Sequence, residues 1–298
     1  MSITSGLSVC LTFDFDAMSV WIGSAKSNNP SMISRGEFAI VAVPRILRLL
    51  ESLKLKASFC IPGHTACAYP DLVKKIRDDD HEIVHHGWVH ENPADFDVAG
   101  ERSILERGLS ALDKAAGVRP VGYRSPGWDL SAATVDLLVE YGFLYDSSCM
   151  AHDFYPYYLR SGDKWTNSDP YRFGKTTSLV ELPVTWGLDD FPAFESVMGL
   201  VPGYNAPSMI REVWQGDFDF AHANCPGGIF NMTLHPQVIG RGHRITMFEQ
   251  LIRYMHQKGN VRFVTMREYA AKWAEGNPLA RWLEDNPVRS GVHSIGSL

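Results

Sequence analysis

The sequence predicts an α/β fold in which one domain is built on a mostly parallel sheet that closes, or nearly closes, into a barrel. Short apolar segments rich in β-forming residues alternate with amphipathic helical segments along most of the 298 residues, as in parallel βα units. No linker, internal repeat or low-complexity tract interrupts this pattern. Residues suited to chemistry recur directly after the predicted strands, and in such barrels the carboxyl ends of the strands carry the site.

The first half of the chain alternates strand and helix regularly. Residues 7–13 form the first expected strand, and a loop rich in Ser, Asn and Gly follows at 17–35. Apolar residues from Val43 to Leu50 recur at i, i+3, i+4 and i+7, which predicts a helix. The later elements of this half are expected, in order, as a strand at 56–61, a helix at 69–77, a strand at 82–85, a helix at 97–116 ended by Gly117, a strand at 120–123, a helix at 131–141 and a strand at 142–145.

The second half begins with a long irregular segment, 146–177, rich in aromatic residues, Pro, Gly and Asp. Loops of this length in compact domains are usually functional. Beyond Gly276 the sequence is a polar tail with two prolines, so we expect one domain at 1–275 and a tail at 276–298. The elements between are expected as a strand at 179–184, a helix near 206–214, a strand at 228–234, a helix around 248–255, a strand at 261–264 and a helix at 266–274.

Composition narrows the function classes. The chain is 45% hydrophobic and 21% charged, and 28 Lys and Arg against 34 Asp and Glu give a net charge of −6 without any block of like charges. This balance gives no electrostatic basis for binding nucleic acid or an anionic membrane. Five scattered cysteines, with no CxxC pair, favour a reducing compartment. With no signal-like start and no apolar window near ~20 residues, we expect a cytoplasmic protein with a small-molecule substrate, and we leave open whether it forms a homo-oligomer.

Two histidines and two aspartates form the candidate site. His86 and His90 are four apart, so one helical turn would place both imidazoles on the same side. Imidazole is the commonest metal ligand, and two at this spacing need one more anion to hold a divalent ion. Asp14 and Asp16 stand where the first strand should end. A single histidine is more often a satisfied polar side chain, but the two pairs together favour a metal site.

Most residues that could act as metal ligands or in catalysis occur at or just after the end of a predicted strand. Polar residues that only pack in the core would not occur at strand ends so consistently, so this distribution favours a single site. Taken alone, each has an ordinary alternative: an aspartate can cap a turn, an arginine can be a surface charge, and a histidine before proline can simply end a strand. The residues at or just past predicted strand ends are Asp14, Asp16, His86, Arg124, Asp189 and His235.

Four short motifs follow one another in a recognisable order. They are Thr12-Phe13-Asp14-Phe15-Asp16, His86-Gly87-Trp88-Val89-His90, Arg124-Ser125-Pro126-Gly127 and Leu234-His235-Pro236. This set resembles the polysaccharide deacetylase family, with its NodB-type domain, over residues 7–273. Three further segments are most similar to an intracellular branch with peptidoglycan-deacetylase-like proteins, cyclic imide hydrolases and allantoinases: Ser34-Arg35-Gly36, Pro62-Gly63-His64 and Leu188-Asp189-Asp190-Phe191-Pro192.

The resemblance implies a deformed (β/α) barrel of seven or eight mostly parallel strands and a hydrolase of non-peptide carbon–nitrogen bonds. It implies one divalent metal, for which zinc is our first choice, with iron, cobalt or manganese as alternatives. The implied ligands are Asp16, His86 and His90. The implied catalytic residues are Asp14 as base, Arg124 as its partner and His235 as general acid.

The chain departs from the family pattern at two positions. Phe15 separates two acids that are usually adjacent, so the roles of Asp14 and Asp16 could be exchanged or shared. Gly87 stands where a Ser or Thr normally braces the second histidine. Neither departure removes a ligand, although both indicate a reshaped pocket.

The substrate is the least specified feature. Loops 17–35 and 146–177 are expected to cover the strand ends, and a covered site favours a small cyclic amide such as an imide or ureide. The alternatives are N-deacetylation of N-acetyl sugars, chitooligosaccharide or peptidoglycan, a metal-independent allantoinase-like reaction, and a non-catalytic binding descendant. Retention of every implied ligand and catalytic residue favours an enzyme. The expected pocket residues are Trp21, Arg35, His64, Trp88, Glu91, Trp128 and Asp190.

Overall fold

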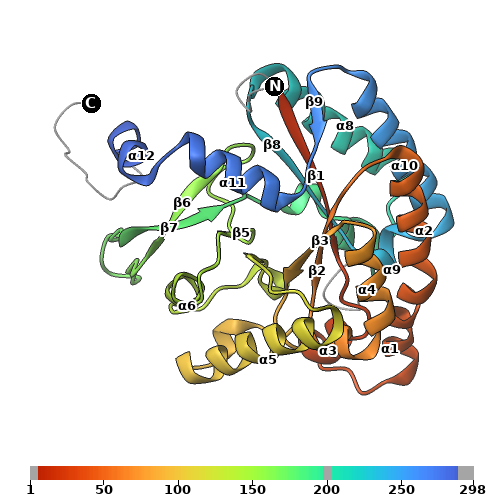
Figure 1. Ribbon diagram of the computed structural model, residues 1–298, viewed down its shortest axis with the longest axis horizontal. Coiled ribbons are helices and arrows are strands. Elements are labelled where there is room, and N and C mark those ends of the chain that lie inside the picture. The colour runs from red at the N-terminus through yellow and green to blue at the C-terminus, as the bar shows by residue number, and fades with distance from the viewer. Residues whose placement is uncertain (1–5, 197–202, 288–298) are drawn as a thin grey trace.

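A mostly parallel, strongly curved sheet forms the centre of the computed structural model, which describes residues 6–196 and 203–287 (Figure 1). Eight strands follow the order β6-β7-β5-β4-β3-β2-β1-β8, and β9 pairs with the start of β1. Among the paired strands of the described residues, only β6 and β7 run antiparallel. The strands of the described residues are β1 (Leu7–Asp14), β2 (Ser58–Ile61), β3 (Glu82–His85), β4 (Gly122–Tyr123), β5 (Tyr145–Asp146), β6 (Tyr157–Ser161), β7 (Lys175–Glu181), β8 (Ile229–Leu234) and β9 (Val261–Phe263).

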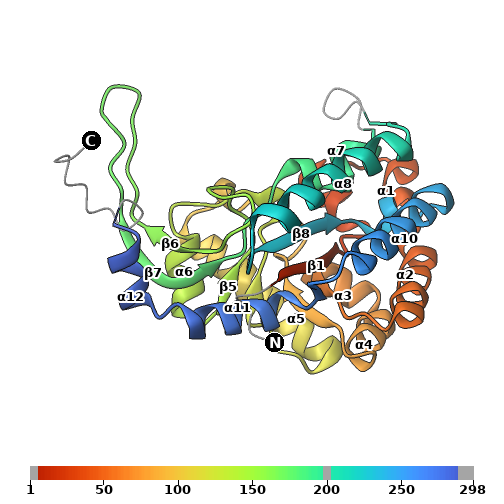
Figure 2. The same ribbon diagram turned by 90° about the horizontal axis from the view of Figure 1, so that it is seen from above.

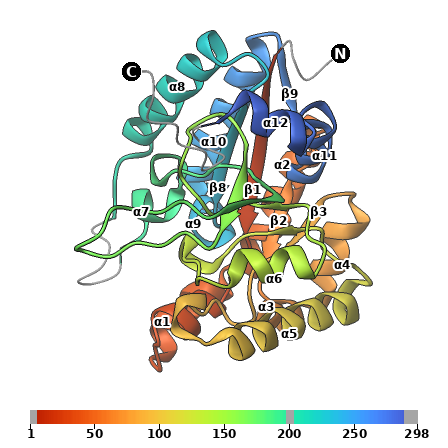
Figure 3. The same ribbon diagram turned by 90° about the vertical axis from the view of Figure 1, so that its left-hand side faces the viewer.

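Helices cover the outside of this sheet, while β1 runs through the middle of the structure (Figure 3). The α-helices are α1 (Pro30–Glu37), α2 (Ala39–Leu53), α3 (Gly63–Ala68), α4 (Pro70–Asp78), α5 (Val98–Ala116), α6 (Thr134–Glu140), α7 (Asp190–Phe194), α8 (Pro207–Asn224), α9 (Pro236–Ile239), α10 (Gly242–Gln257), α11 (Met266–Gly276) and α12 (Leu279–Asp285). Short turns of other helix types are η2 (Val20–Ser24), η3 (Pro93–Asp95), η4 (Pro126–Trp128) and η5 (Trp186–Leu188). The predicted deformed (β/α) barrel is therefore confirmed, with nine strands in the described part of the chain.

The core explains why β1 is central. All eight of its residues are buried, as expected for a strand covered on both faces. The Phe13 ring stacks on Phe59 of β2 at 5.0 Å and meets Phe248 of α10 edge-on at 6.2 Å. These aromatic contacts fix the sheet against its helical layer, and they place the carboxyl end of β1 at one edge of the barrel.

The signals that predicted helix boundaries act as expected in α5. The Asp97 side chain accepts a hydrogen bond from the Gly100 amide at 2.8 Å and caps the first turn. Gly117 ends the helix with a φ of 64°, a left-handed conformation that glycine adopts without strain. The periodic residues 43–50 likewise lie in α2, which buries them.

The segment 146–177 differs from its prediction. It contains β6 and the start of β7, which pair as an antiparallel hairpin. Because β7 begins at Lys175 and runs parallel to β5, the hairpin tip at 162–174 lies beyond the amino ends of the strands. Figure 2 shows the hairpin extending away from the body of the barrel. This tip therefore does not cover the carboxyl ends, where the site was expected.

Part of the predicted tail is also structured. Residues 279–285 form α12, where Trp282 is buried and meets the ring of Tyr158 edge-on at 5.4 Å. A short apolar pattern of this kind gives too little periodic signal to predict one helix of two turns. Residues 288–298 of the expected tail lie outside the described part of the chain, and the division into one domain and a tail stays a prediction.

The structure also bears on the cysteines, for which free thiols were expected, and on the expectation that no segment spans a membrane. All five cysteines are free thiols, and burial raises the pKa of the Cys10 and Cys60 thiols well above the ordinary value. Thiols buried in this way are poor nucleophiles. Within residues 6–196 and 203–287, no helix is long and apolar enough to cross a bilayer.

Candidate active site

The carboxyl ends of β1, β3, β4 and β8 bring the six predicted ligands and catalytic residues into one buried cluster. Parallel strands end at the same edge of a sheet, so residues far apart in sequence meet there. Each residue in the cluster is at most 6% exposed. The cluster consists of Asp14, Asp16, His86, His90, Arg124 and His235.

Asp16 is the centre of a candidate cation site. Its Oδ1 lies 3.3 Å from His86 Nε2 and 3.8 Å from His90 Nε2. Neither carboxylate oxygen has a hydrogen-bond partner, although the side chain is fully buried, and His86 Nε2 also lacks one. A buried carboxylate without donors is costly unless a cation compensates it. Two nitrogens and one carboxylate that converge in this way fit a divalent metal.

The hydrogen bonds on the far side of each imidazole fix its tautomer. His86 Nδ1 lies 2.7 Å from the Arg124 carbonyl oxygen, which can only accept, so Nδ1 carries the proton. The Ser24 hydroxyl donates to the His90 carbonyl at 2.7 Å and therefore accepts from His90 Nδ1 at 2.6 Å. When the rings are neutral, as binding of a metal requires, the lone pair of each is on Nε2, the atom that faces Asp16. Burial lowers the pKa of His90 to about 4, against the opposing effect of Asp16, so its ring is neutral.

The two histidines do not meet through a helical turn, which corrects the spacing argument. The residues between them form an irregular loop in which Gly87 has a φ of 71° and His90 a φ of 63°. The two rings nevertheless lie edge-on with their centroids 4.9 Å apart. Left-handed residues at both ends reverse the chain, so the prediction that these imidazoles converge holds for a different structural reason.

Ser24 takes the bracing position that Gly87 cannot fill. It lies on η2, 66 positions from His90, and its contact depends on how the 17–35 segment folds beside the loop after β3. No local pattern in the sequence predicts that these two segments pack together. Hydroxyl or carboxylate groups behind a ligating histidine orient the ring and raise its basicity.

We expect Ser24→Ala to weaken metal binding by about 10–100-fold, the usual cost of losing such a supporting group. The variant leaves the ligand set intact but frees His90 to rotate. Titration of metal-free protein with zinc measures the effect, with Ser34→Ala as the matched control, because Ser34 bonds only the Ser31 carbonyl in its own helix. An affinity equal to that of the wild type would mean that Ser24 does not orient the ligand.

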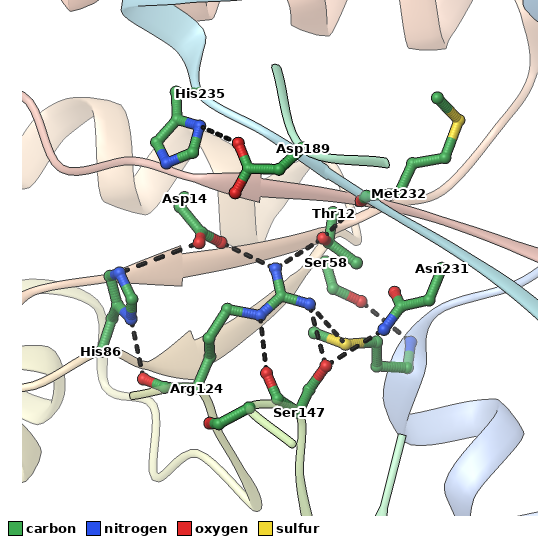
Figure 4. Close-up of polar contacts among 12 residues, drawn as sticks. Thr12, Asp14, Ser58, His86, Arg124, Ser147, Asp189, Asn231, Met232 and His235 are labelled. Carbon is green, nitrogen blue, oxygen red and sulfur yellow. Dashed lines mark hydrogen bonds and ion pairs between the residues drawn. The ribbon is translucent and has the colours of Figure 1, made fainter. Parts of the chain in front are cut away.

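Arg124 is a fully buried cation held against Asp14 (Figure 4). Its Nη1 donates to Asp14 Oδ1 at 2.8 Å and to Thr12 Oγ1 at 2.7 Å. Its Nε and Nη2 donate to the carbonyl and hydroxyl oxygens of Ser147 at 3.1 and 2.9 Å. Burial acts to raise the pKa of Asp14, but Arg124 and the nearby histidines outweigh it and lower that pKa to about 2. Asp14 is therefore ionised, and one of its oxygens is already committed to Arg124.

His235 is held by two neighbouring acids. Asp190 Oδ1 accepts from both the His235 amide at 2.9 Å and Nδ1 at 2.7 Å, and Asp189 Oδ1 lies 3.7 Å from Nδ1. His235 Nε2 lies 3.7 Å from Asp16 Oδ2. Burial opposes the charged form of the ring, but these carboxylates raise the pKa of His235 well above its ordinary value. The ring is therefore a proton donor that faces the cluster.

Asp190 was predicted as a pocket residue, and the structure shows it in contact with His235, the predicted general acid. Asp189 was absent from the predicted site, although its place at a strand end was noted. Burial and the neighbouring Asp190 raise the pKa of Asp189 to about 7, against the opposing effect of His235. Asp189 forms a β-bridge with Thr233, which holds it beside the end of β8.

The other predicted pocket residues lie around the cluster, mostly in contacts with the protein itself. Glu91 Oε2 accepts from the Val89 amide and shapes the ligand loop. Arg35 donates to Glu195 at 3.0 Å and lies over the buried ring of Trp21 at 5.3 Å. His64 lies edge-on to Trp88 with ring centroids 6.1 Å apart.

Trp128 belongs to an aromatic pair at the rim. It is buried and follows β4, and its ring centroid lies 4.1 Å from that of Trp186, which follows β7. Trp186 is 49% exposed. Both residues follow strands at the carboxyl edge of the sheet, so the exposed ring of Trp186 offers an aromatic surface at this edge.

Comparison with known proteins agrees with this arrangement. Residues 4–145 match the family model "Polysaccharide deacetylase". A peptidoglycan deacetylase of Helicobacter pylori is 35% identical over 279 residues, which cover 89% of this chain and 95% of that protein. This chain belongs to the polysaccharide deacetylase family. As a member, it is a hydrolase of carbon–nitrogen bonds other than peptide bonds. Deacetylases of this family generally use a divalent metal, for which Asp16, His86 and His90 are candidate ligands.

Solved structures show the same fold as this member of the polysaccharide deacetylase family. A Mycobacterium smegmatis structure assigned to the polysaccharide deacetylases is 33% identical, with a TM-score of 0.81 and 92% of each chain covered. The Puue allantoinase structure is 22% identical, with a TM-score of 0.75 and 92% of each chain covered. At that identity the allantoinase shares the fold with this chain, and the likeness carries no further conclusion.

Proposed function

We propose that this chain is a metal-dependent N-deacetylase of N-acetylated amino sugars in a glycan of the peptidoglycan type. The observation that carries the proposal is the likeness to the Helicobacter pylori peptidoglycan deacetylase along nearly the whole length of both chains. The buried cluster supports it, because it combines a candidate cation site, an ionised carboxylate and a protonated imidazole. Hydrolysis of an amide needs each of these parts.

Asp16, His86 and His90 would hold the metal. A divalent cation supplies Lewis acidity there, which polarises the amide carbonyl and makes water a stronger acid. Zinc is our first choice, although iron, cobalt or manganese suit two imidazoles and one carboxylate. The unpartnered oxygens of Asp16 favour it as the ligand over Asp14, whose Oδ1 is committed to Arg124.

Asp14 and His235 handle the protons in this proposal. Asp14 stays ionised beside Arg124 and accepts a proton from the attacking water, which is the work of a general base. His235 Nε2 donates a proton to the departing amine nitrogen, because the Asp190 carboxylate holds Nδ1 and keeps the ring charged. The exposed Trp186 face, beside Trp128, gives a sugar ring an apolar surface at the rim.

Hydrolysis of a small cyclic amide is the second candidate. It is favoured by the depth of the cluster, in which Asp14 and His86 are 2% and 1% exposed, and by the 17–35 segment, which borders the site through Ser24 and His90. The tip of the other expected cover, residues 162–174 of the 146–177 segment, extends beyond the opposite edge of the sheet. Part of the argument from covering loops is thereby lost, and the glycan takes first place.

We expect acetate release from N-acetylglucosamine oligomers, and no comparable turnover of succinimide, dihydrouracil, hydantoin or allantoin. Assaying these compounds side by side, before and after removal of metal by a chelator, tests substrate and metal dependence together. Turnover of a cyclic amide without turnover of the oligomers would favour the second candidate. Allantoin hydrolysis that persists in metal-free protein would instead indicate a metal-independent reaction.

A further inference from the structure

Two fully buried acids face each other behind Arg124. Asp146 of β5 and Glu181 of β7 are direct partners in the register of these parallel strands, and both are 0% exposed. One carboxylate oxygen of Asp146 lies within 4.8 Å of one of Glu181. Asp146 Oδ2 and Glu181 Oε2 have no hydrogen-bond partner among the described residues, while Asp146 Oδ1 and Glu181 Oε1 accept from the segment that follows β5. Two carboxylates this close together can hydrogen-bond to each other only when a proton lies between them.

The groups around the pair do not supply a neutralising partner. Cys149 and Tyr157 face it from the end of β5 and from β6, and burial raises the pKa of both, so they are neutral. Arg124 is a cation that acts on Asp146, but its guanidinium donates to Asp14, Thr12 and Ser147. Arg160 of β6 acts on Cys149 and is itself paired with Asp163. Like charges in a dry interior cannot both persist, so one acid keeps a proton.

We propose that Asp146 and Glu181 share one proton and act together as a positioning pair that holds the 147–149 segment against Arg124. Glu181 Oε1 accepts from the Ser148 and Cys149 amides, both at 2.9 Å. Asp146 Oδ1 accepts from the Ser148 hydroxyl at 2.7 Å, and that hydroxyl in turn accepts from the Ser125 amide at 2.9 Å. The pair therefore holds the 147–149 segment from Asp146 and from Glu181, and Ser148 of this segment in turn holds Ser125, the residue after Arg124.

This arrangement reaches the catalytic residues through Ser147. Its carbonyl and hydroxyl oxygens accept three of the hydrogen bonds in this region, from Arg124 Nε at 3.1 Å, from Arg124 Nη2 at 2.9 Å and from the Asn231 amide group at 3.1 Å (Figure 4). Loss of the shared proton would set two charges against each other and displace this segment. Arg124 would then lose the contacts that aim it at Asp14. The link to turnover rests on the proposed function, whereas the shared proton does not.

The pair makes folding stability depend on pH in a defined direction. Burial raises the pKa of Asp146 to about 6 and that of Glu181 well above its ordinary value, and their mutual repulsion adds to the effect on Glu181. The native state therefore binds more protons than the unfolded chain, whose acids have pKa values of about 4. Stability from the pair is fully present below about pH 4 and is lost as the pH rises through the native pKa values.

Glu181→Gln tests the proposal, because the amide mimics the protonated acid without a proton to lose. Its oxygen can accept from the Ser148 and Cys149 amides, and its NH₂ can donate to Asp146. We expect the thermal midpoint of the wild type to fall between pH 6 and pH 9, while the variant stays level and exceeds the wild type at the alkaline end. The pH at which turnover declines on the alkaline side should also be higher in the variant than in the wild type. Glu275→Gln, at an exposed position on α11, is the control and should follow the wild type.

Three results would overturn the proposal. The first is a thermal midpoint of Glu181→Gln that falls with pH in parallel with that of the wild type. The second is a Glu181→Gln variant that is less stable at every pH and also loses one equivalent of metal. That result would mean that a cation, and not a proton, lies between the acids. The third is failure of both Glu181→Gln and Asp146→Asn to fold, because either amide should satisfy the partner acid. Thermal midpoints are measured without substrate, so a wrong proposed function would remove only the turnover comparison.

Discussion

Asp14→Asn should lower turnover by about 10²–10⁴-fold, the usual cost of losing a general base, while the metal content stays at the wild-type level. The amide oxygen can still accept the hydrogen bond that Arg124 Nη1 donates at 2.8 Å, so the local geometry is kept. A neutral amide cannot take a proton from water. The three candidate ligands are untouched, because Asp16 contributes the carboxylate that faces both histidines.

Turnover at saturating substrate and elemental analysis of the same preparation measure the two halves of this expectation. Asp113→Asn is the matched control, since Asp113 is an exposed residue of α5. An Asp14→Asn variant with an empty metal site would mean that Asp14 is the ligand, and that the roles of the two aspartates are exchanged around Phe15. Full turnover in the variant would remove Asp14 from the mechanism.

The sequence predicted the parts of this fold that depend on local patterns. Helix α5 has the boundaries that Asp97 and Gly117 indicate, and β3 ends at His85 as expected. The convergence of Asp14, His86 and His235 followed from one rule, that the ends of parallel strands meet at one edge. Such rules hold because backbone hydrogen bonding and burial act on short stretches of chain.

What the sequence could not predict depends on contacts between distant segments. Ser24 braces His90 from 66 positions away, and no periodicity links them. The β6–β7 hairpin pairs Tyr157 with Glu181, yet β6 lacks the alternation of polar and apolar residues that marks a half-buried strand. Ser147 directly follows a predicted strand, so its position carried a signal, but a serine there has too many ordinary roles for its contact with Arg124 to be inferred.

Asp16→Asn should weaken metal binding by more than the about 10–100-fold expected when only a supporting group is lost. The substitution removes the sole carboxylate of the ligand group and leaves the imidazoles of His86 and His90. It should not unfold the protein, because the Asp16 oxygens accept no hydrogen bond that the fold would lose. Turnover should fall with occupancy of the site.

The rise in thermal midpoint on adding zinc to metal-free protein separates loss of a ligand from loss of structure. Binding to the native state alone raises stability in proportion to the logarithm of ligand concentration over Kd. The wild type should show this rise, and Asp16→Asn should show almost none at the same zinc concentration, with metal-free midpoints that remain similar. Ser24→Ala should fall between the two, since it keeps all three ligands. An undiminished rise in Asp16→Asn would exclude Asp16 as a ligand, because removing its charge would then leave the affinity of the site unchanged.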